Sequence, residues 1–425
     1  MARKMKDSGI EWIGEIPEGW ETCLYKYCCS VQPGYPFDSA KFSNSSTDSF
    51  PLIRIRDITS GEIQTYYTGE YPPNYIVTAG DLLVGMDGDF NVRWWNNDAA
   101  LLNQRCCRVT EKNSVLRRFL YYVLPFTLQH INTLTYATTV KHLANGDILN
   151  SFIAFPSLPA QQNIVHYLDT VCSEIDAILS KTRSSIEEYK KLKQAVITQA
   201  VTKGVRGERE MKDSGVEWAG LVPHHWGVAK IGSIGQTSSG ATPLRSKEAS
   251  FFDDAAIRWV RTLDLNDGLV YDSSEKITEL ALASSACSIM PKGTVCVAMY
   301  GGAGTIGKCG LLMSDCATNQ AVCSIVCNRE IVSPIFLLMQ LLALKSYWMK
   351  YAVGTRKDPN ISQDVVARMK ILIPPLDEQK EITDYLDAKC AEVDKLIAKK
   401  EQLVKELESY KKSLIYEVVT GKREV

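Results

Sequence analysis

The glycine-rich segment at residues 301–309 is the part of this sequence that comes nearest to a reactive site. Gly302, Gly307 and Lys308 almost complete the G-x-x-x-x-G-K-[ST] pattern, in which backbone amides and a lysine hold nucleotide phosphates. The next residue, Cys309, has no hydroxyl group for magnesium, and the run that follows is more typical of a returning strand than of a helix. We therefore interpret the segment as a hairpin loop. The alternative hypothesis for this segment is a nucleotide site, which would make the protein a P-loop-like nucleotide-binding enzyme.

Other catalytic or metal-binding patterns are missing from the sequence. No serine lies in a G-x-S-x-G elbow, and no pair of cysteines has the C-x-x-C spacing of zinc or redox sites. Cys316, Cys323 and Cys327 are close in sequence, but they fall in runs that alternate like strands. The histidines, which also lack metal-ligand spacing, are His130, His142, His166, His224 and His225. We therefore predict no catalytic residue, no metal site, and thiols that are reduced and mostly buried.

Basic and polar side chains interleaved with aromatic residues are the stronger chemical signal. An arginine fork reads a guanine edge or clamps a phosphate, and asparagine reads adenine. Residues of these types recur at equivalent places in the two halves of the chain. We predict that DNA contacts come from Arg54, Arg56, Arg93, Arg105, Thr138, Thr139, Lys141, Arg245, Lys247, Arg258, Arg261, Thr355, Arg356, Lys357 and Asn360.

These residues belong to a sequence that is written twice. Residues 5–14 return with few changes as residues 211–220, and a Pro-x-x-Trp follows each copy. A second echo matches residues 156–176 to residues 374–394 without a gap. The ends of the two repeats are therefore alike and their middles differ, which indicates a pseudo-twofold protein that presents two different surfaces on one frame.

Each repeat begins with a globular part of mixed strands and helices. Short β-branched and aromatic runs broken by Gly, Pro, Asn and Asp predict strands. In the first repeat the predicted strands are 52–56, 81–86 and 104–109, with a helix over 115–129. In the second repeat they are 257–261, 293–299 and 321–326, with a helix over 333–351.

The hydrophobic period then changes to about 3.5 residues in both repeats, which predicts two long amphipathic helices with matching apolar seams. We expect them to pair with each other in antiparallel fashion; the alternative is that each folds onto its own globular part. Asp377 is the predicted N-cap of the second helix, and Gly204 and Gly421 are the predicted helix ends. The predicted helix interface comprises Ile164, Leu168, Ile175, Ile178, Tyr189, Leu192, Leu386, Val393, Leu396, Leu403, Leu407 and Leu414.

Composition narrows the class of protein. The chain has 425 residues, which is long for a single core and predicts two to four domains. Lys+Arg 48 against Asp+Glu 49 gives a formal net charge of -1, so any nucleic-acid surface must be local. Since no apolar run approaches the length of roughly eighteen residues that a membrane helix needs, we expect a cytoplasmic protein.

Motifs at the ends of each repeat give the chain a family resemblance. They are the paired Asp-Ser-Gly-x-Glu-Trp openings, Pro-x-Leu-x-x-Gln at residues 156–161 and 374–379, and Asn-Gln at 103–104 and 319–320. With these motifs, the chain resembles the specificity subunit of a Type I restriction-modification system over essentially its full length. One departure is Pro159-Ala160-Gln161, where the family more often has an acidic residue before Gln, as in Asp377-Glu378-Gln379.

The resemblance implies the domain organisation. It divides the chain into target-recognition domain 1 (1–155), helical spacer region 1 (156–205), target-recognition domain 2 (206–373) and helical spacer region 2 (374–425). The fold class is α/β (α+β), with two pseudo-twofold-related globular domains separated by a long antiparallel two-helix coiled coil.

The resemblance also implies the activity. Each domain would read one half of a bipartite, asymmetric DNA site, and the helical spacer would set the gap and dock two methyltransferase (modification) subunits. ATP-dependent restriction subunits would join them. The chain itself would be non-catalytic and hold no cofactor, with S-adenosylmethionine, ATP and Mg²⁺ in the partner subunits. A coiled-coil scaffold without DNA contacts is the third hypothesis.

Overall fold

The computed structural model describes residues 3–112, 114–134, 142–252, 255–301, 304–354 and 359–425. Two compact units make up the chain: unit 1 is Met1–Thr182 with Gln402–Val425, and unit 2 is Arg183–Glu401. Each unit takes part of both long helices, whereas the sequence-based domain boundaries treated the helical regions as separate segments. In the described ranges, no helix is both long and apolar enough to cross a membrane.

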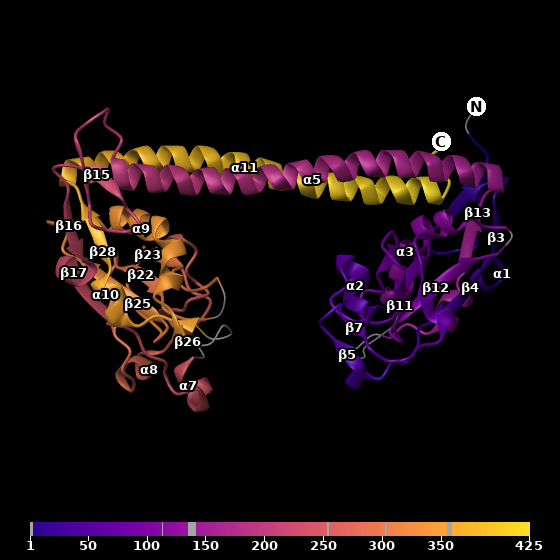
Figure 1. Cartoon of the computed structure of the whole chain (residues 1–425), viewed down its shortest axis with the longest axis horizontal. Helices are drawn as coiled ribbons and strands as arrows, with labels where there is room; N and C mark the ends of the chain where they lie inside the picture. Colours follow the sequence, from indigo (N-terminus) through magenta and orange to yellow (C-terminus); the bar gives the residue numbers. More distant parts are fainter. Residues whose placement is uncertain (1–2, 113, 135–141, 253–254, 302–303, 355–358) are drawn as a thin grey trace. The chain divides into compact units, whose positions relative to one another are not determined.

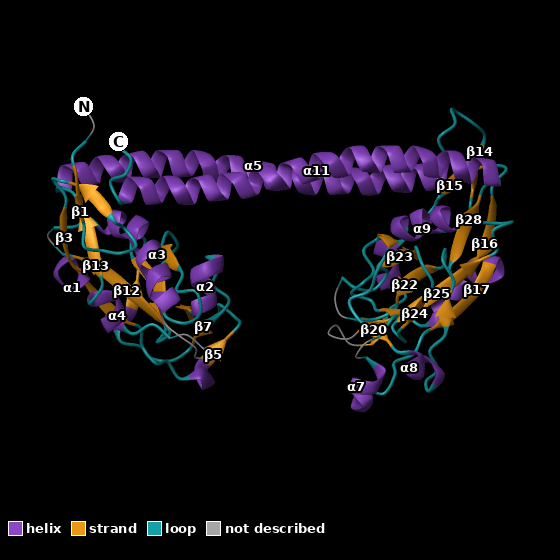
Figure 2. Cartoon of the chain, turned by 180° about the vertical axis from the view of Figure 1, so that it is seen from behind, coloured by secondary structure: helices purple, strands orange, loops and turns teal. Residues whose placement is uncertain are grey.

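Unit 1 contains short strands, small helices and parts of the two long helices (Figures 1 and 2). In chain order the elements are β1 (Met5–Asp7), β2 (Glu15–Pro17), β3 (Glu21–Leu24), α1 (Tyr25–Cys28), β4 (Cys29–Pro33), η1 (Ser39–Lys41), β5 (Phe42–Ser43), β6 (Phe50–Ile53), α2 (Ile55–Ser60), β7 (Tyr66–Tyr67), η2 (Pro73–Tyr75), β8 (Ile76–Val77), β9 (Leu82–Gly85), β10 (Val92–Trp94), β11 (Ala100–Leu102), β12 (Cys106–Glu111), α3 (Arg117–Leu134), α4 (Asn145–Leu149), β13 (Phe152–Phe155) and α5 (Leu158–Lys203), which continues into unit 2.

Unit 2 repeats this plan. Its elements are β14 (Met211–Asp213), β15 (Leu221–Pro223), β16 (Gly227–Lys230), α6 (Ile231–Ile234), β17 (Gly235–Ser239), η3 (Arg245–Lys247), α7 (Glu248–Phe251), β18 (Ile257–Val260), β19 (Gly268–Val270), β20 (Lys276–Ile277), α8 (Glu279–Ala283), β21 (Ile289–Met290), β22 (Val295–Ala298), β23 (Cys309–Leu312), β24 (Cys316–Thr318), β25 (Val322–Cys327), α9 (Pro334–Ala343), η4 (Lys345–Lys350), β26 (Val353–Gly354), β27 (Pro359–Asn360), α10 (Gln363–Arg368), β28 (Lys370–Ile373) and α11 (Leu376–Val419), which continues into unit 1.

Two small sheets carry the fold of each unit. In unit 1 their strand orders are β10-β9-β12-β4 and β5-β7-β6-β11-β8; in unit 2 they are β17-β25-β22-β23-β19 and β20-β18-β24-β21. The pairings of β9 with β12 and of β22 with β25 are antiparallel, and those of β6 with β11 and of β18 with β24 are parallel. The two units therefore share the same core topology, as the sequence repeat predicts, while the edge strands β5 in unit 1 and β19 in unit 2 have no counterpart among the described residues of the other unit. Their content of mixed helix and sheet confirms the predicted fold class.

The repeated Asp-Ser-Gly opening forms the same turn in both units. The Asp7 carboxylate accepts the Gly9 amide at 2.9 Å, and the Ser8 hydroxyl accepts the Ile10 amide at 3.0 Å. In unit 2 the Asp213 carboxylate accepts the amide of Gly215, again at 2.9 Å. Because Gly9 has a φ of 70° and Gly215 a φ of 63°, glycine is the residue that this turn tolerates without strain.

The long helices α5 and α11 pack against each other in each unit, which confirms their predicted pairing. In unit 1, Lys411 of α11 contacts Asp176 of α5 at 2.6 Å. In unit 2, Lys193 of α5 contacts Asp394 of α11 at 2.7 Å, and these two residues are the repeat equivalents of the first pair. The ends of the helices are also as predicted, since Gly204 and Gly421 follow α5 and α11 with φ values of 72° and 70°.

The predicted helix interface is wrong at four positions. Ile178, Leu192, Leu396 and Leu403 are exposed, with relative exposures of 47%, 49%, 38% and 41%. Buried Leu179 and half-buried Ile397 and Val404 lie next to three of these residues, and ion-paired Lys193 lies next to Leu192. Two adjacent apolar residues fit a 3.5-residue repeat almost equally well, and the aliphatic part of a lysine side chain can also occupy a position in the helix interface. The sequence pattern therefore does not show which of two neighbouring residues faces the other helix.

Other predicted boundaries also differ from the structure, including the helix predicted over 115–129, which is Arg117–Leu134. The strand predicted over 52–56 ends at Ile53, because the Asp57 carboxylate accepts the Arg54 amide at 2.8 Å and starts α2. The helix predicted over 333–351 ends at Ala343 and is followed by η4, whose Trp348 ring lies against Gly307. α11 begins at Leu376, so Asp377 lies in its first turn and is not its N-cap.

Gln161 and Gln379, the repeated glutamines at the start of α5 and α11, fix each long helix to its globular part. The buried Gln161 amide donates to the carbonyls of Ser114 and Pro156 at 3.0 and 2.9 Å, and its oxygen accepts the Leu116 amide at 2.9 Å. Gln379 donates to the carbonyls of Ile331 and Pro374 and accepts the Ser333 amide. The repeated motif is therefore a structural clamp.

Replacing Gln161 with leucine is expected to lower the free energy of unfolding by about 3 kcal/mol, because buried backbone groups lose their partners. Urea denaturation of the purified chain measures this value. Gln162→Leu is the matched control, since Gln162 is exposed and its replacement is expected to change stability by less than about 0.5 kcal/mol. Equal losses in the two variants would show that Gln161 is not a clamp.

Candidate nucleic-acid interface

The start of the candidate interface is a pair of equivalent turns that follow β6 and β18. In unit 1 the Asp57 carboxylate holds the Arg54 amide, and in unit 2 the Asp264 carboxylate holds the Arg261 amide, both at 2.8 Å. Burial raises the pKa of Asp57, although the Arg54 amide and the Arg56 charge act in the opposite direction. The two turns place one arginine at the same point of each unit.

These equivalent arginines have different surroundings. Arg54 is exposed, and its guanidinium carbon lies 5.8 Å from the centre of the Phe42 ring. Arg261 is partly buried and forms an ion pair with Glu275, with its guanidinium also 5.9 Å from the Trp259 ring centre. The same turn therefore presents an exposed arginine in unit 1 and an ion-paired arginine in unit 2.

Other arginines and a lysine of unit 2 join Arg261 in a mixed network. Arg245 forms a second ion pair with Glu275 and lies 4.4 Å from the Phe252 ring centre. Arg258 contacts Asp272 at 3.1 Å, and the exposed Lys247 lies 5.3 Å from the ring centre of Phe251. Glu275 and Asp272 offset part of this positive charge, so a phosphate would have to compete with Glu275 for Arg245 and Arg261.

Two of the predicted arginines of unit 1 make contacts within the fold. Arg93 donates to the carbonyls of Ile58 and Thr59 at the end of α2, where a cation stabilises the helix terminus. Arg56 donates to the Thr65 hydroxyl at 2.7 Å but remains about half exposed. Their DNA contacts stay a prediction, and the contacts that they make here limit how far each can reach.

Arg105 lies at a cluster that the sequence did not reveal. Its NH1 lies 3.6 Å from the Asp87 carboxylate, and His142 contacts the same carboxylate oxygen at 2.7 Å. A backbone bridge joins Asp87 to His142. Asp87 was missed because it is not part of a recognised motif. His142 directly follows the predicted residue Lys141 in the sequence and is the repeat equivalent of the predicted residue Asn360.

The side chains that the structure describes at the corresponding place in unit 2 are neutral. Tyr300 and Asn360 form the equivalent backbone bridge, and Gln320 accepts a hydrogen bond from the Thr242 hydroxyl. Burial raises the pKa of Tyr300, with its hydrogen bond to Gln320 acting against this rise, so the hydroxyl keeps its proton at neutral pH. Of the other predicted residues, Thr138, Thr139, Lys141, Thr355, Arg356 and Lys357 lie outside the described residues.

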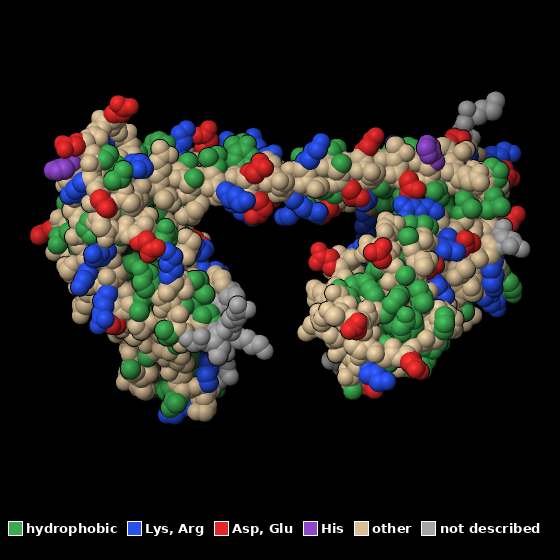
Figure 3. Space-filling model, in the orientation of Figure 1, with side chains coloured by type: hydrophobic (Ala, Val, Ile, Leu, Met, Phe, Trp, Pro, Cys, Tyr) green, Lys and Arg blue, Asp and Glu red, His purple; other side chains and the backbone are tan. Residues whose placement is uncertain are grey.

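Charge along the visible face of the molecule is mixed. Figure 3 shows Lys and Arg interspersed with Asp and Glu along α5 and α11 and over both units. This distribution agrees with the formal net charge of -1. This face of the molecule therefore offers nucleic acid individual cationic side chains and not one broad basic field.

The described part of the glycine-rich segment, Gly301 and residues 304–309, does not form a phosphate loop. The Gly307 amide donates to the Ala298 carbonyl at 2.9 Å, and β23 follows directly after Lys308. β23 pairs antiparallel with β22, so the segment joins two strands of a hairpin. A phosphate loop instead requires a helix N-terminus after the lysine, which this segment lacks.

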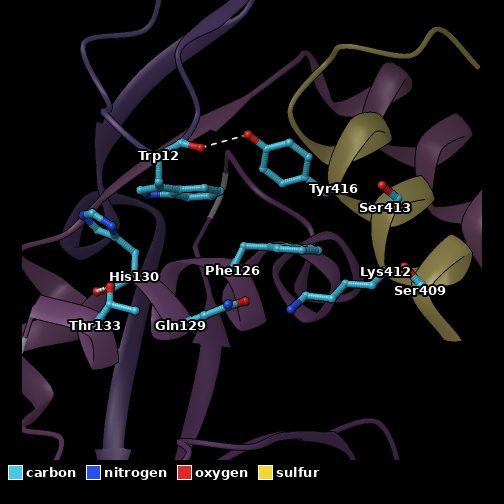
Figure 4. Close-up of a pocket in the computed structure, with 9 residues that line it drawn as sticks. All are labelled: Trp12, Phe126, Gln129, His130, Thr133, Ser409, Lys412, Ser413 and Tyr416. Atoms are coloured by element: carbon cyan, nitrogen blue, oxygen red, sulfur yellow. Dashed lines mark hydrogen bonds between the residues drawn. The ribbon is translucent and has the colours of Figure 1, made fainter. Parts of the chain in front are cut away.

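An open groove of about 440 Å³ lies in unit 1 between α3, α11 and the N-terminal repeated segment (Figure 4). Trp12, Phe126 and Tyr416 supply its aromatic walls, and Lys412 and His130 are its basic lining residues. The Tyr416 hydroxyl donates to the Trp12 carbonyl at 2.9 Å. This hydrogen bond fixes the N-terminal repeat motif to the end of α11.

No group of three or more His, Cys, Asp or Glu side chains in the described ranges has an arrangement that could hold a metal ion. Most of the cysteines are buried, with Cys23, Cys327 and Cys390 half-buried. Burial raises the pKa of Cys323 to about 12, which keeps this thiol protonated.

Comparisons with known proteins agree with the repeat. The family model for the Type I restriction modification DNA specificity domain matches the chain twice, at residues 17–188 and 223–408. The specificity subunit of the Type I restriction enzyme EcoBI from Escherichia coli is 29% identical over 406 residues, which cover 93% of this chain and 84% of that protein. The MjaVIII specificity subunit from Methanocaldococcus jannaschii is 23% identical over 419 residues, which cover 96% and 93%.

A solved structure shares the fold. It concerns complex assembly and conformational transition of the type I R-M system, and one of its chains matches with a TM-score of 0.71 at 16% identity. The match covers 96% of this chain and 99% of that chain. At this level of identity the likeness supports the fold.

Proposed function

This chain belongs to the family of Type I restriction-modification DNA specificity subunits, and from this premise we propose that each of its two units reads one half of a bipartite DNA site. A subunit of this family recognises DNA sequence. We further propose that the site is asymmetric, and that the α5–α11 pair sets the length of the gap between the half-sites, whose bases are not read. The chain itself performs no chemistry in this proposal.

The observation that carries the proposal is one topology with two different surfaces. Arg54 is exposed in unit 1, whereas its equivalent Arg261 is held by Glu275 in unit 2. Base recognition depends on which donors and acceptors reach the groove edges. Two units with the same core fold but different polar side chains therefore favour two half-sites of different sequence.

Exposed apolar side chains on α5 and α11 fit a role in docking partners. Ile178 and Leu396 are repeat equivalents, and so are Leu192 and Tyr410; all four are exposed. Single exposed apolar side chains are common on protein surfaces, but their recurrence at equivalent positions of both repeats favours a shared role. We propose that two copies of a methyltransferase subunit bind these equivalent surfaces.

The proposed assembly includes double-stranded DNA and ATP-dependent restriction subunits in the cytoplasm. S-adenosylmethionine, ATP and Mg²⁺ are expected in the partner subunits. This chain would contribute sequence recognition and the spacing between half-sites, while its partners would supply methyl transfer to adenine and DNA cleavage.

The two alternative functions have less support. A nucleotide-binding enzyme would need the segment before Lys308 to lead into a helix, but it leads into β23. A coiled-coil scaffold without DNA contacts would not need two elaborated globular parts with different polar surfaces. Both alternatives remain open to the following experiment.

The test is a map of N6-methyladenine in cells that express the chain with the modification subunit of its own system. The expected result is one bipartite methylated sequence. Replacing residues 1–155 with the first domain of another specificity subunit is expected to change one half of this sequence and leave the other half unchanged. An unchanged sequence after the exchange would support the scaffold, and a wild-type map without any bipartite site would contradict the proposed function.

A further inference from the structure

We propose that Arg105 reads a guanine in the half-site of unit 1, with Asp87 as its positioning residue. This inference rests on the proposed function, because it assumes that unit 1 reads DNA. It adds which side chain recognises which base, and it explains how two units with one topology come to read different sequences.

Backbone hydrogen bonds bring three separate segments to the Arg105 cluster. Asp87 follows β9, Arg105 precedes β12, and His142 lies before α4. The Met86 amide donates to the Arg105 carbonyl at 2.9 Å, and the Leu143 amide donates to the Met86 carbonyl at 2.7 Å. The cluster is therefore built on backbone that is hydrogen-bonded on both sides, which limits the movement of its side chains.

The cluster combines exposure with internal order. The side chains of Arg105 and His142 are 56% and 50% exposed, whereas Asp87 is 24% exposed. The Nδ1 atom of His142 lies 2.7 Å from Asp87 and 3.5 Å from NH1 of Arg105. The shorter contact assigns the Nδ1 proton to the bond with Asp87, so Arg105 interacts with the cluster through its ion pair with this carboxylate.

This arrangement leaves donors of Arg105 available. Both of its contacts use NH1, and the described part of the chain contains no partner for its Nε or NH2. Guanine presents N7 and O6 in the major groove, and a guanidinium donates to both atoms at once. An arginine held at one nitrogen by a carboxylate loses less side-chain entropy when its other donors bind.

Unit 2 has the same backbone with different chemistry. The Met299 amide donates to the Ala321 carbonyl at 2.8 Å, and the Ile361 amide donates to the Met299 carbonyl at 2.9 Å. These bonds make Ala321 the equivalent of Arg105, while Tyr300 and Asn360 replace Asp87 and His142. Among the residues that the structure describes, unit 2 has no arginine at the position equivalent to Arg105.

The experiment compares N6-methyladenine maps from cells that express the wild-type chain, Arg105→Ala or Asp87→Asn with the modification subunit of the same system. With Arg105→Ala, one position of the unit 1 half-site is expected to lose its preference for guanine by roughly tenfold or more, while all other positions keep theirs. With Asp87→Asn, the same position is expected to keep guanine as the preferred base but with weaker discrimination.

Arg3→Ala is the matched control, because it removes an exposed arginine of unit 1 that is not part of the cluster, and its map is expected to be unchanged. Thermal unfolding of each variant checks that it folds as the wild type does. A folded Arg105→Ala variant that methylates the wild-type sequence, or methylates it uniformly less with no position relaxed, would overturn the inference. A wild-type map without a bipartite site would instead contradict the proposed function.

Discussion

Adding seven residues to both α5 and α11 is expected to end methylation of the wild-type sequence and to create a methylated site whose gap is longer by about three base pairs. Seven helical residues add about 10.5 Å to each helix, and one base pair rises about 3.4 Å. The half-sites are expected to stay the same, because neither globular part changes. Maps of N6-methyladenine from cells that express the lengthened chain measure the gap directly.

The length of the insertion follows from the seam between the helices. Seven residues complete two steps of a 3.5-residue repeat, so the apolar positions stay in register. Exposed positions after Ser184 in α5 and after Gln402 in α11 are suitable insertion points. One residue inserted at each point turns the following residues by about 100° and is expected to misalign the seam and destabilise the chain. A folded seven-residue variant that methylates the wild-type gap would show that these helices do not set the spacing.

Replacing Glu378 with alanine is expected to lower the free energy of unfolding by about 4 kcal/mol. Its side chain is 0% exposed and forms an ion pair with Arg209, which is only 16% exposed. It also contacts His225 at 2.9 Å and accepts the Trp226 indole N–H at 3.1 Å. Removal of the carboxylate would leave Arg209 largely buried without its counter-charge, which is the costly way to break a buried pair.

The Glu378 contribution should depend on pH. Burial by itself would raise the pKa of Glu378, but hydrogen bonds from His225, Arg209 and Trp226 outweigh it and hold the pKa below its ordinary value. Because the folded-state pKa is the lower one, the stabilisation is fully present above the unfolded pKa of about 4.3 and is lost as pH falls through the folded value. The stability difference between wild type and Glu378→Gln is therefore expected to be constant near neutral pH and to shrink below about pH 4.

Calorimetric unfolding at a series of pH values measures both effects. Glu381→Ala is the control, since Glu381 pairs with Arg206 on the exposed surface, where an ion pair is screened by solvent and contributes little to stability. If Glu378→Ala and Glu381→Ala cost the same, the buried network contributes no more than a surface ion pair. Ala160 is the equivalent residue in unit 1, so this network stabilises unit 2 alone.

The difference between Glu378 and Ala160 is visible in the sequence, but its consequence is not. The sequence shows that the residue before the repeated glutamine differs between the repeats: Ala160 precedes Gln161, and Glu378 precedes Gln379. Only the fold shows that Arg209, His225 and Trp226, all far from Glu378 in the chain, surround the carboxylate. The partners of a buried charge come from other elements, so local sequence patterns contain little information about them.

The sequence by itself determined the features that depend on local order. The repeat predicted two units with one topology, the 3.5-residue period predicted α5 and α11, and glycines able to adopt a positive φ marked the helix ends at Gly204 and Gly421. The sequence also identified the family, because the repeated motifs are short segments with a fixed structure. Periodicity and turn chemistry act between residues that are close in the chain, and a sequence states them directly.

Only the tertiary structure decided which side chains are available for binding. It buried Leu179 where the seam had been placed at Ile178, used Arg93 to hold α2, and assembled Arg105 with Asp87 and His142 from three segments. Each of these outcomes depends on atoms from distant parts of the chain competing for the same space or the same carboxylate. That competition is settled by packing and charge pairing in three dimensions, which residue type and spacing do not specify.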